Sequence, residues 1–235
     1  FQKPKGIDVS EDKIFVADSS NYRIQVFDLD GNFLFKFGSK GSGNGQFDCP
    51  QDIKFYKNQI YVVDSDNHRI QIFDINGNFI AKFGSEGKED GELKKPYKFD
   101  IYDDKIFIVE PFGDRIQVFD LYGNFLFNFG SQGNDNGELK FPEDIIVWEE
   151  KIFVTDLGNN RIQIFDINGN FVTTIGPNVT YAEFERPHSI AVSDNKIFVA
   201  DSPVYRVQIF EASDILSSSL SSTSEVEYDQ IKTIN

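Results

Sequence analysis

The stretch DNHRIQIFDINGNF, residues 66–79, decides the fold, because close copies of it occur along the whole chain. A catalytic motif has no reason to occur five times in a small protein, whereas a structural unit does. The copies are SNYRIQVFDLDGNF at 20–33, GDRIQVFDLYGNF at 113–125, NNRIQIFDINGNF at 159–171 and the shorter YRVQIFEAS at 205–213. The sequence therefore predicts a repeat protein.

The repeat has a fixed period. Its arginine stands at 23, 69, 115, 161 and 206, and a proline stands at 4, 50, 96, 142 and 187, so both series step by 46, 46, 46 and 45 residues. Fixed-period self-similarity of this length is typical of solenoids and propellers. The chain is five copies of one unit.

Each unit predicts four short strands. The first follows the proline, as in QDIKFY (51–56) and EDIIVW (143–148), and the second is a β-branched and aromatic run such as IFVAD at 14–18. The third is RIQVFD or RIQIFD, whose alternation has the period of two of a strand. The fourth is GNFLFKFG (31–38) and its relatives. We expect a four-stranded antiparallel meander.

The turn between the third and fourth strands carries Asp30-Gly31, Asn76-Gly77 and Asn168-Gly169. Asp-Gly and Asn-Gly supply the positive φ angles of a two-residue type I′ hairpin. The pair Tyr122-Gly123 fits that turn poorly. We expect type I′ hairpins at this place in each blade.

A single four-stranded sheet cannot bury both of its faces, and packing such sheets radially around an axis solves this. The 25 phenylalanines suit the space between neighbouring sheets, and they recur at fixed positions. The sequence thus predicts an all-β fold, a β-propeller of four-stranded antiparallel blades with five repeat units and a five- or six-bladed ring. The recurring positions are Phe27, Phe73, Phe119, Phe165 and Phe210, and Phe33, Phe79, Phe125 and Phe171.

The segment GSKGSGNGQFDCPQDIKFYKNQIYVVDSDNHRIQIFDINGNFIAKFG resembles the NHL repeat. The resemblance rests on a glycine-rich loop, a proline, a VVD-like strand and an N-x-RIQ-F strand, and it covers about residues 1–211. It implies a propeller, usually six-bladed, whose first strands line a central channel. We expect one domain over 1–235, with blades at about 1–38, 47–84, 93–130, 139–176 and 184–235.

The end of the chain departs from the pattern. DILSSSLSSTSEV lies within a Ser-rich insert at 213–226, and EYDQIKTIN (227–235) follows. The last segment is either the fourth strand of the last blade or a disordered tail. Asn178 begins a glycosylation sequon, which matters only in a secreted protein.

Composition narrows the function classes. The chain has 38 acids against 23 bases and a formal net charge of −15. An acidic surface repels nucleic-acid backbones and anionic lipids, so we expect neither nucleic-acid binding nor membrane insertion. The two histidines and one cysteine are a poor supply for a zinc site. We expect no cofactor and no metal.

An acid stands five residues before the arginine of every unit. The acid ends the second strand and the arginine begins the third, so both flank one turn, where they can pair. A ring of ligand sites is the functional alternative, but fivefold recurrence favours a structural pair made once per blade. The pairs are Asp18/Arg23, Asp64/Arg69, Glu110/Arg115, Asp156/Arg161 and Asp201/Arg206.

The glycine-rich loops at 38–47, 84–93 and 130–139 lack the Lys-Ser/Thr pair and following helix of a phosphate loop. They also lack the register of a calcium loop. We expect them only to connect one blade to the next.

The residues after each proline differ between units, and varied polar groups at a channel mouth are what a recognition site needs. The alternative is a solvated rim with no ligand. The pairs are Lys5-Gly6, Gln51-Asp52, Tyr97-Lys98, Glu143-Asp144 and His188-Ser189. The predicted binding residues are Gln51, Asp52, Tyr97, Lys98, Glu143, Asp144 and His188, and no catalytic residue is assigned.

The sequence favours a non-enzymatic propeller scaffold that presents its loops to a protein, peptide or glycan in a secreted or cell-surface assembly. The rival is a divalent-cation-dependent lyase or lactone hydrolase with Asp52, Glu143 and Asp144 in the channel. A third hypothesis is that the chain is a segment of a longer surface polypeptide.

Overall fold

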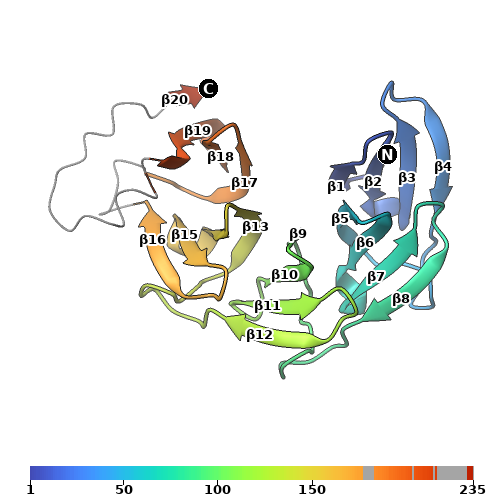
Figure 1. Ribbon diagram of the computed structural model, residues 1–235, viewed down its shortest axis with the longest axis horizontal. Helices are drawn as coiled ribbons and strands as arrows, with labels where there is room; N and C mark the ends of the chain where they lie inside the picture. Colours follow the sequence, from blue (N-terminus) through green and yellow to red (C-terminus); the bar gives the residue numbers. More distant parts are fainter. Residues whose placement is uncertain (177–182, 203, 214, 216–231, 235) are drawn as a thin grey trace, which may run out of the picture. The chain divides into compact units, whose positions relative to one another are not determined.

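The computed structural model describes residues 1–176, 183–202, 204–213, 215 and 232–234, and it contains twenty strands in five sheets (Figure 1). Every sheet has four strands, and consecutive strands along the chain are neighbours in the sheet. The prediction of an all-β propeller of four-stranded antiparallel blades with five repeat units is confirmed.

The blades are numbered in chain order. Blade 1 contains β1 (Pro4–Val9), β2 (Lys13–Asp18), β3 (Arg23–Asp28) and β4 (Phe33–Phe37). Blade 2 contains β5 (Pro50–Tyr56), β6 (Gln59–Asp64), β7 (Arg69–Asp74) and β8 (Phe79–Phe83). Blade 3 contains β9 (Phe99–Tyr102), β10 (Lys105–Glu110), β11 (Arg115–Asp120) and β12 (Phe125–Phe129).

Blade 4 contains β13 (Pro142–Trp148), β14 (Lys151–Asp156), β15 (Arg161–Asp166) and β16 (Phe171–Ile175). Blade 5 contains β17 (Pro187–Ser193), β18 (Lys196–Asp201), β19 (Arg206–Glu211) and β20 (Lys232–Ile234). Three short 3-10 turns join the second and third strands of blades 1, 2 and 4: η1 (Ser19–Asn21), η2 (Ser65–Asn67) and η3 (Leu157–Asn159).

The chain forms two compact units. Unit 1 contains Phe1–Phe112 and Gln117–Phe127, and unit 2 contains Gly113–Ile116 and Asn128–Asn235. Blades 1 and 2 lie wholly in unit 1, and blades 4 and 5 lie wholly in unit 2.

The hairpins between the third and fourth strands are not two-residue type I′ turns, so that prediction is wrong. Only the glycines have positive φ there, as at Gly31 (83°), and Gly31 N donates to Asp28 O over 3.1 Å. The loop has three residues and ends in a left-handed glycine, which explains the register shift after Val26. Tyr122 is tolerated because its own φ is not positive.

Type I′ geometry instead occurs between the first and second strands. Lys57 and Asn58 have φ of 45° and 63°, and Glu149 and Glu150 have 47° and 58°. Positive φ at two consecutive residues defines this turn, and it normally favours Asn and Gly. The sequence hid it because several of these pairs contain Lys or Glu and none contains glycine.

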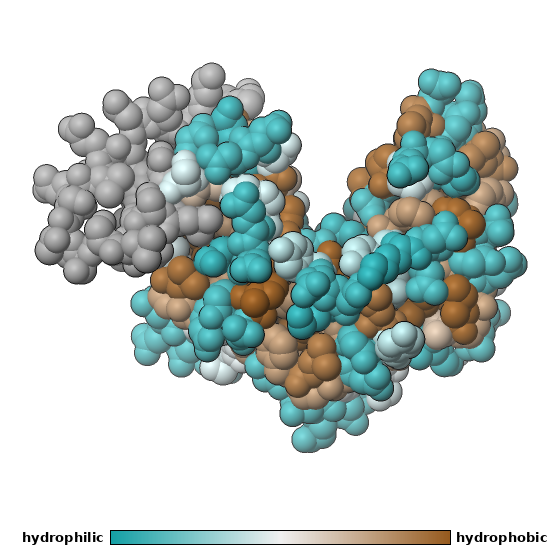
Figure 2. Space-filling view, viewed as in Figure 1, coloured by the Kyte–Doolittle hydropathy of each residue, from teal (hydrophilic) through white to brown (hydrophobic). Residues whose placement is uncertain are grey.

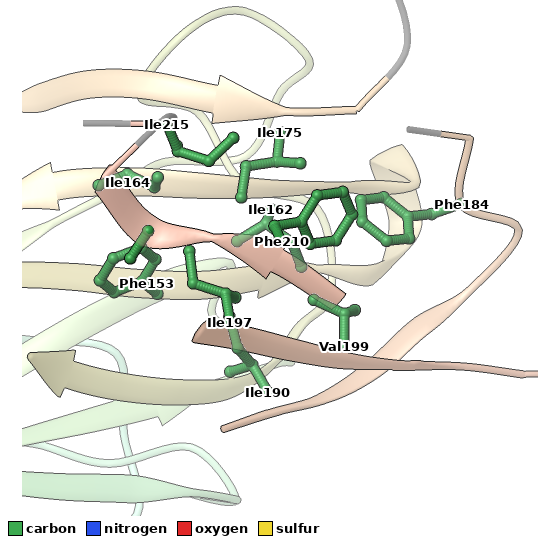
Figure 3. Close-up of a cluster of buried hydrophobic side chains, with 11 residues drawn as sticks. Phe153, Ile162, Ile164, Ile175, Phe184, Ile190, Ile197, Val199, Phe210 and Ile215 are labelled. Atoms are coloured by element: carbon green, nitrogen blue, oxygen red, sulfur yellow. The ribbon is translucent and has the colours of Figure 1, made fainter. Parts of the chain in front are cut away.

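Neighbouring blades within a unit share a hydrophobic core. In unit 2, four residues of blade 4 pack against seven of blade 5 (Figure 3). Fully burying one large apolar side chain contributes about 1.5–3 kcal/mol, so these layers dominate the stability of the fold. The set is Phe153, Ile162, Ile164 and Ile175 with Phe184, Ile190, Ile197, Val199, Phe210, Ala212 and Ile215.

The same pattern occurs in unit 1, where blade 2 lies between its two neighbours. Phe15, Ala17, Ile24 and Val26 of blade 1 pack against Phe47, Ile53, Ile60, Val62 and Phe73 of blade 2. The opposite side of blade 2 packs on blade 3 through Tyr61, Val63, Ile70 and Ile72. Alternate residues of one strand therefore serve two different neighbours.

The last strand closes the fifth sheet. β20 pairs antiparallel with β19, with Val207 opposite Ile234 and Ile209 opposite Lys232. Of the two alternatives for 227–235, the fourth strand therefore describes Lys232–Ile234. Asn178 and most of the Ser-rich insert lie outside the described residues.

On the face shown in Figure 2, hydrophilic residues cover much of the described surface, with hydrophobic residues between them. Among the described residues, no helix is long and apolar enough to span a membrane.

Candidate functional site

The acid and the arginine flanking the second turn form a direct ion pair in four blades. The arginine Nε lies 2.8 Å from the Asp18 carboxylate, 2.8 Å from Asp64, 2.7 Å from Asp156 and 3.0 Å from Asp201. The register that makes this possible places each acid opposite its arginine across the hairpin. In blade 3, Glu110 belongs to unit 1 and Arg115 to unit 2.

Each of these carboxylates also accepts hydrogen bonds from donors other than its arginine. Asp64 accepts hydrogen bonds from Asp48 N (2.7 Å), Asn67 Nδ2 (2.9 Å) and Gln71 Nε2 (3.1 Å). The Asp64 side chain is fully buried, and a buried charge needs such donors to offset its lost hydration. The glutamine and the asparagine were not among the predicted residues, although both recur within the repeated stretch.

The arginine also fixes the glycine-rich loop. Arg69 donates from Nη1 to Ser42 O (2.7 Å) and from Nη2 to Gly43 O and Gln46 O (both 2.9 Å). Arg161 Nη2 does the same with Asp135 O and Glu138 O, at 2.8 Å each. These loops therefore turn carbonyl oxygens towards a cation, which is the opposite of an anion-binding loop.

The pKa values of Asp64 and Asp18 are shifted in opposite directions. Burial raises the pKa of the Asp64 carboxyl above its usual value, against the donors around it. For Asp18, burial also acts to raise the pKa, but bonds from Gln2 N, Asn21 and Arg23 hold it below the usual value. The same motif thus has different electrostatics in blades 1 and 2.

Two of the predicted binding residues of unit 1 join neighbouring blades. Asp52 accepts a hydrogen bond from Lys98 Nζ (3.1 Å) and one from Phe99 N (3.3 Å). Gln51 Nε2 lies 3.5 Å from Cys49 Sγ in its own blade, and Tyr97 N donates to Val109 O. The structure brings Asp52 and Lys98 together and places Gln51 and Tyr97 beside other residues.

The predicted binding residues of unit 2 make a second such junction. His188 Nδ1 lies 2.6 Å from Glu143 Oε2. The Asp144 carboxylate accepts from Ser189 Oγ (2.6 Å), from Ile190 N (3.1 Å) and from Ile145 N (2.9 Å). Each acid that a catalytic metal would require therefore already accepts hydrogen bonds from neighbouring groups.

A cluster of charges on the first strands of unit 1 was missed. Lys54 Nζ on β5 lies 3.3 Å from Asp100 Oδ1 on β9. Burial acts to lower the pKa of Lys54, but Asp100, Asp52 and Asp8 outweigh it and raise the pKa to about 12. These residues could have been found by comparing the fourth position after each of the first three prolines, where Asp8, Lys54 and Asp100 alternate in charge.

No group of three or more His, Cys, Asp or Glu side chains in the described part of the chain is arranged to hold a metal ion. In unit 1, the ammonium group of Lys54 interacts with the carboxylates of Asp100, Asp52 and Asp8. The polar residues of the first strands thus connect one blade to the next.

One end of the blades presents variable side chains on a constant backbone. We call it the proline end, because the first strand begins there at the proline, opposite the acid of the second strand, as in Pro50 and Asp64. The turn residue before each arginine is left-handed in all five blades, with φ between 50° and 56°. The residues are Tyr22, His68, Asp114, Asn160 and Tyr205.

Comparison with known proteins places the chain in a family. A family model described as a 6-bladed beta-propeller matches residues 1–53 and 46–129, more than half of the chain, and a model of the NHL repeat matches residues 184–210. The Drosophila melanogaster protein brain tumor is 41% identical over 54 residues, which are 23% of this chain. This chain spans 5% of the length of that relative.

Several solved structures share the fold. A streptogramin B lyase has a TM-score of 0.69 at 16% identity, covering 89% of this chain and 66% of that one. Virginiamycin B lyase from Staphylococcus aureus has 0.68 at 15%, covering 89% and 67%, and hydrazine synthase from Kuenenia stuttgartiensis has 0.70 at 15%, covering 94% and 68%. At such identities the likeness concerns the fold alone. By its family match, this chain belongs to the 6-bladed β-propellers, and it contains an NHL repeat at residues 184–210.

Proposed function

We propose that the chain is a non-enzymatic propeller scaffold that binds a protein or peptide through the proline end of its blades. NHL propellers commonly bind proteins, which favours this class of partner. The observation that carries the proposal is the set of left-handed turn residues, in which five blades hold one backbone conformation and show five positions with varied side chains.

The network beneath these turns explains how variation is tolerated. The buried acid and its arginine fix the ends of the second and third strands, so the turn can carry different side chains. His68 and Asp114 use theirs within the chain, since His68 Nδ1 lies 3.2 Å from Leu93 O and the Asp114 carboxylate accepts from Phe141 N. Aromatic residues are enriched at protein interfaces because they bury a large area. Tyr205, which is 88% exposed at this end, is the strongest candidate anchor.

The test is site-specific photocrosslinking with a matched control. Tyr205 and Tyr122 are 88% and 89% exposed, but Tyr122 lies in the turn between the third and fourth strands, at the opposite end of the blades. A photoreactive phenylalanine at position 205 should give a discrete protein adduct with native extract, and the same probe at 122 should not. Equal adducts at both positions, or adducts formed only at 122, would reject the proposal.

The rival is a divalent-cation-dependent lyase or lactone hydrolase, and one observation favours it. A histidine whose Nδ1 is held by a carboxylate, as His188 is by Glu143, keeps Nε2 available as a base. Titration calorimetry with Mg²⁺ and Mn²⁺ separates the two functions. The scaffold proposal expects no saturable binding, whereas one tightly held ion per chain that is lost in Glu143→Gln would favour the enzyme.

We further propose that the protein acts in a secreted or cell-surface assembly. The support is the sequon at Asn178 and the Ser-rich segment at 213–226. Treatment of the native protein with an N-glycosidase should lower its mass. If the mass stays unchanged while a glycosylated standard is fully digested by the same enzyme, this location is contradicted. If the protein binds a glycan array and no protein, the partner is a glycan instead.

A further inference from the structure

The side chain of His68 holds the backbone that leads into blade 3. His68 lies between the turn η2 and β7, and Lys95 N donates a hydrogen bond to its Nδ1 over 3.2 Å. The His68 side chain is 13% exposed, so this bond is largely shielded from water. A neutral imidazole accepts at one nitrogen only, so the bond from Lys95 places the ring proton on Nε2. The contact therefore requires an uncharged His68.

The backbone held in this way, residues 94–98, is here called the entry segment of blade 3. The first strand of blade 3 begins only at Phe99, whereas the first strands of blades 2, 4 and 5 begin at their proline. Lys95 has a left-handed φ of 49° directly before Pro96. Such a conformation in a residue other than glycine is strained, and it persists only where surrounding contacts hold it. The bond to His68 is one of these contacts.

Protonation of the ring exchanges one backbone partner for another. Leu93 O also lies 3.2 Å from His68 Nδ1. A protonated Nδ1 is a donor, so it can bond Leu93 O, but it has no lone pair left for the N–H of Lys95. A backbone N–H that loses its acceptor away from water is costly. Protonation of His68 thus removes one restraint on the strained residue of the entry segment.

The charged groups beside the ring come from the loop before blade 3, from the entry segment and from blade 2. Glu86 Oε1 lies 3.9 Å from the ring Nε2, and the Glu86 side chain is 79% exposed. Lys95 Nζ pairs with Asp66 Oδ1 over 3.0 Å, and Arg69 pairs with Asp64. Because each of these cations is matched by a carboxylate and Glu86 favours a charged imidazole, the surroundings do not prevent protonation.

The next blade makes the same contact with a different acceptor. Asp114 occupies the position of His68, and its carboxylate accepts a hydrogen bond from Phe141 N over 2.7 Å. In both contacts the donor stands 27 residues after the acceptor. Phe141 also has a left-handed φ, 50°, directly before a proline. A carboxylate remains an acceptor between about pH 5 and pH 8, whereas histidine changes charge in that range.

The second histidine has a contact of the opposite kind. His188 Nδ1 lies 2.6 Å from Glu143 Oε2, and a protonated ring keeps a carboxylate partner. Release of a backbone group by acid is therefore expected of His68 and not of His188.

We propose that His68 is a pH-sensitive latch on the entry segment of blade 3. The neutral ring holds the N–H of Lys95 and keeps the segment closed, and protonation breaks this bond, so the segment opens locally as the pH falls. The segment includes Tyr97 and Lys98 and lies at the proline end, so acid alters the surface that the proposed function assigns to a partner. The latch does not depend on that function, because it is measured on an amide of this chain.

Amide hydrogen exchange of the full chain, followed by NMR between about pH 7.5 and about pH 5, tests the latch. Each rate is divided into the rate of an unstructured peptide at the same pH, which removes the intrinsic pH dependence of exchange. We expect the protection of the Lys95 amide to fall at least about tenfold on acidification, and that of the Phe141 amide to change less than about twofold. The ¹⁵N shifts of the His68 ring should show an unprotonated Nδ1 at the higher pH.

His68→Asp is the matched variant, because it gives blade 2 the acceptor that the next blade has in Asp114. Aspartate also tolerates the left-handed φ of 56° at position 68. In this variant the protection of the Lys95 amide should no longer depend on pH in the same range.

Four results would overturn the proposal. They are constant Lys95 protection while His68 titrates, an equal fall at Phe141, a proton on Nδ1 at the higher pH, and an unchanged pH dependence in His68→Asp. The first three need no variant, so the test stands even if His68→Asp does not fold.

Discussion

Arg23 of blade 1 and Arg69 of blade 2 occupy the same position of two neighbouring blades, yet their surroundings differ. The Arg69 side chain is 6% exposed and donates to Asp64 and to three carbonyls of the loop before it. The Arg23 side chain is 27% exposed and pairs with Asp18. The difference teaches that a repeat is completed by the segment that precedes it, as expected where stability is a sum of units and their interfaces.

The largest effect is expected for the arginines themselves. Arg69→Ala leaves the fully buried Asp64 carboxylate without its counter-ion and should lower the free energy of unfolding by about 3–5 kcal/mol. Arg23→Ala also leaves a buried carboxylate, Asp18, but Arg23 itself is 27% exposed, so the loss should be smaller, about 1–3 kcal/mol. Urea unfolding of the full chain measures both.

Arg161→Ala is the matched control, because Arg161 is also largely buried and also donates to two loop carbonyls. It should behave like Arg69→Ala. If all three variants lose the same stability, the preceding loop contributes nothing and the comparison fails.

The turn glycines give the next effect. Gly31 and Gly77 share φ of 83°, so alanine at either position should cost about 1–2 kcal/mol for the left-handed backbone. Gly77→Ala has a further cost of about 1–3 kcal/mol, because its Cβ would lie 2.6 Å from the Phe37 ring. Thermal unfolding should therefore rank Gly77→Ala as the less stable variant, and a reversed order would contradict the close approach.

A smaller difference in stability is expected between substitutions of Ile53 and Ile7, which occupy the same position of blades 2 and 1. Ile53→Val removes one buried methyl group and should cost about 0.5–1.5 kcal/mol. Ile7→Val removes the same group from a side chain that is 64% exposed and should stay within about 0.5 kcal/mol of the unchanged protein. Equal losses in urea unfolding would mean that Ile7 is buried in solution.

The period-two pattern and the period of 46 residues were enough to predict the fold, because a strand buried on one face repeats its apolar residues regardless of context. The pairing of Asp64 with Arg69 also follows from sequence spacing, since a short turn must bring both ends of a hairpin together. The type of turn did not follow. At Glu149 and Glu150 the hairpin imposes positive φ on residues that do not favour it.

The candidate site was harder to predict, because its contacts join residues about 46 positions apart. Asp52 was expected at a channel mouth to meet a ligand, but it accepts from Lys98 and Phe99 of the next blade. Variation between repeats shows where residues are free to differ, but it does not separate contact with a ligand from contact with a neighbouring blade. Only the register of adjacent first strands makes that separation.

The smallest expected effect is the dependence of stability on pH that Asp18 and Asp64 contribute. Asp18 has a folded-state pKa below its usual value of 3.8, so its contribution to stability is present above pH 3.8 and is lost as the pH falls through the folded pKa. Asp64 has a raised pKa because of burial, so its ionised form disfavours folding, and this penalty is relieved as the pH falls. We expect the ¹³C resonance of the Asp64 carboxyl to titrate above pH 3.8 and that of Asp18 below it. An Asp18 midpoint at or above that of Asp64 would contradict this order and show that the donors around Asp18 do not outweigh its burial.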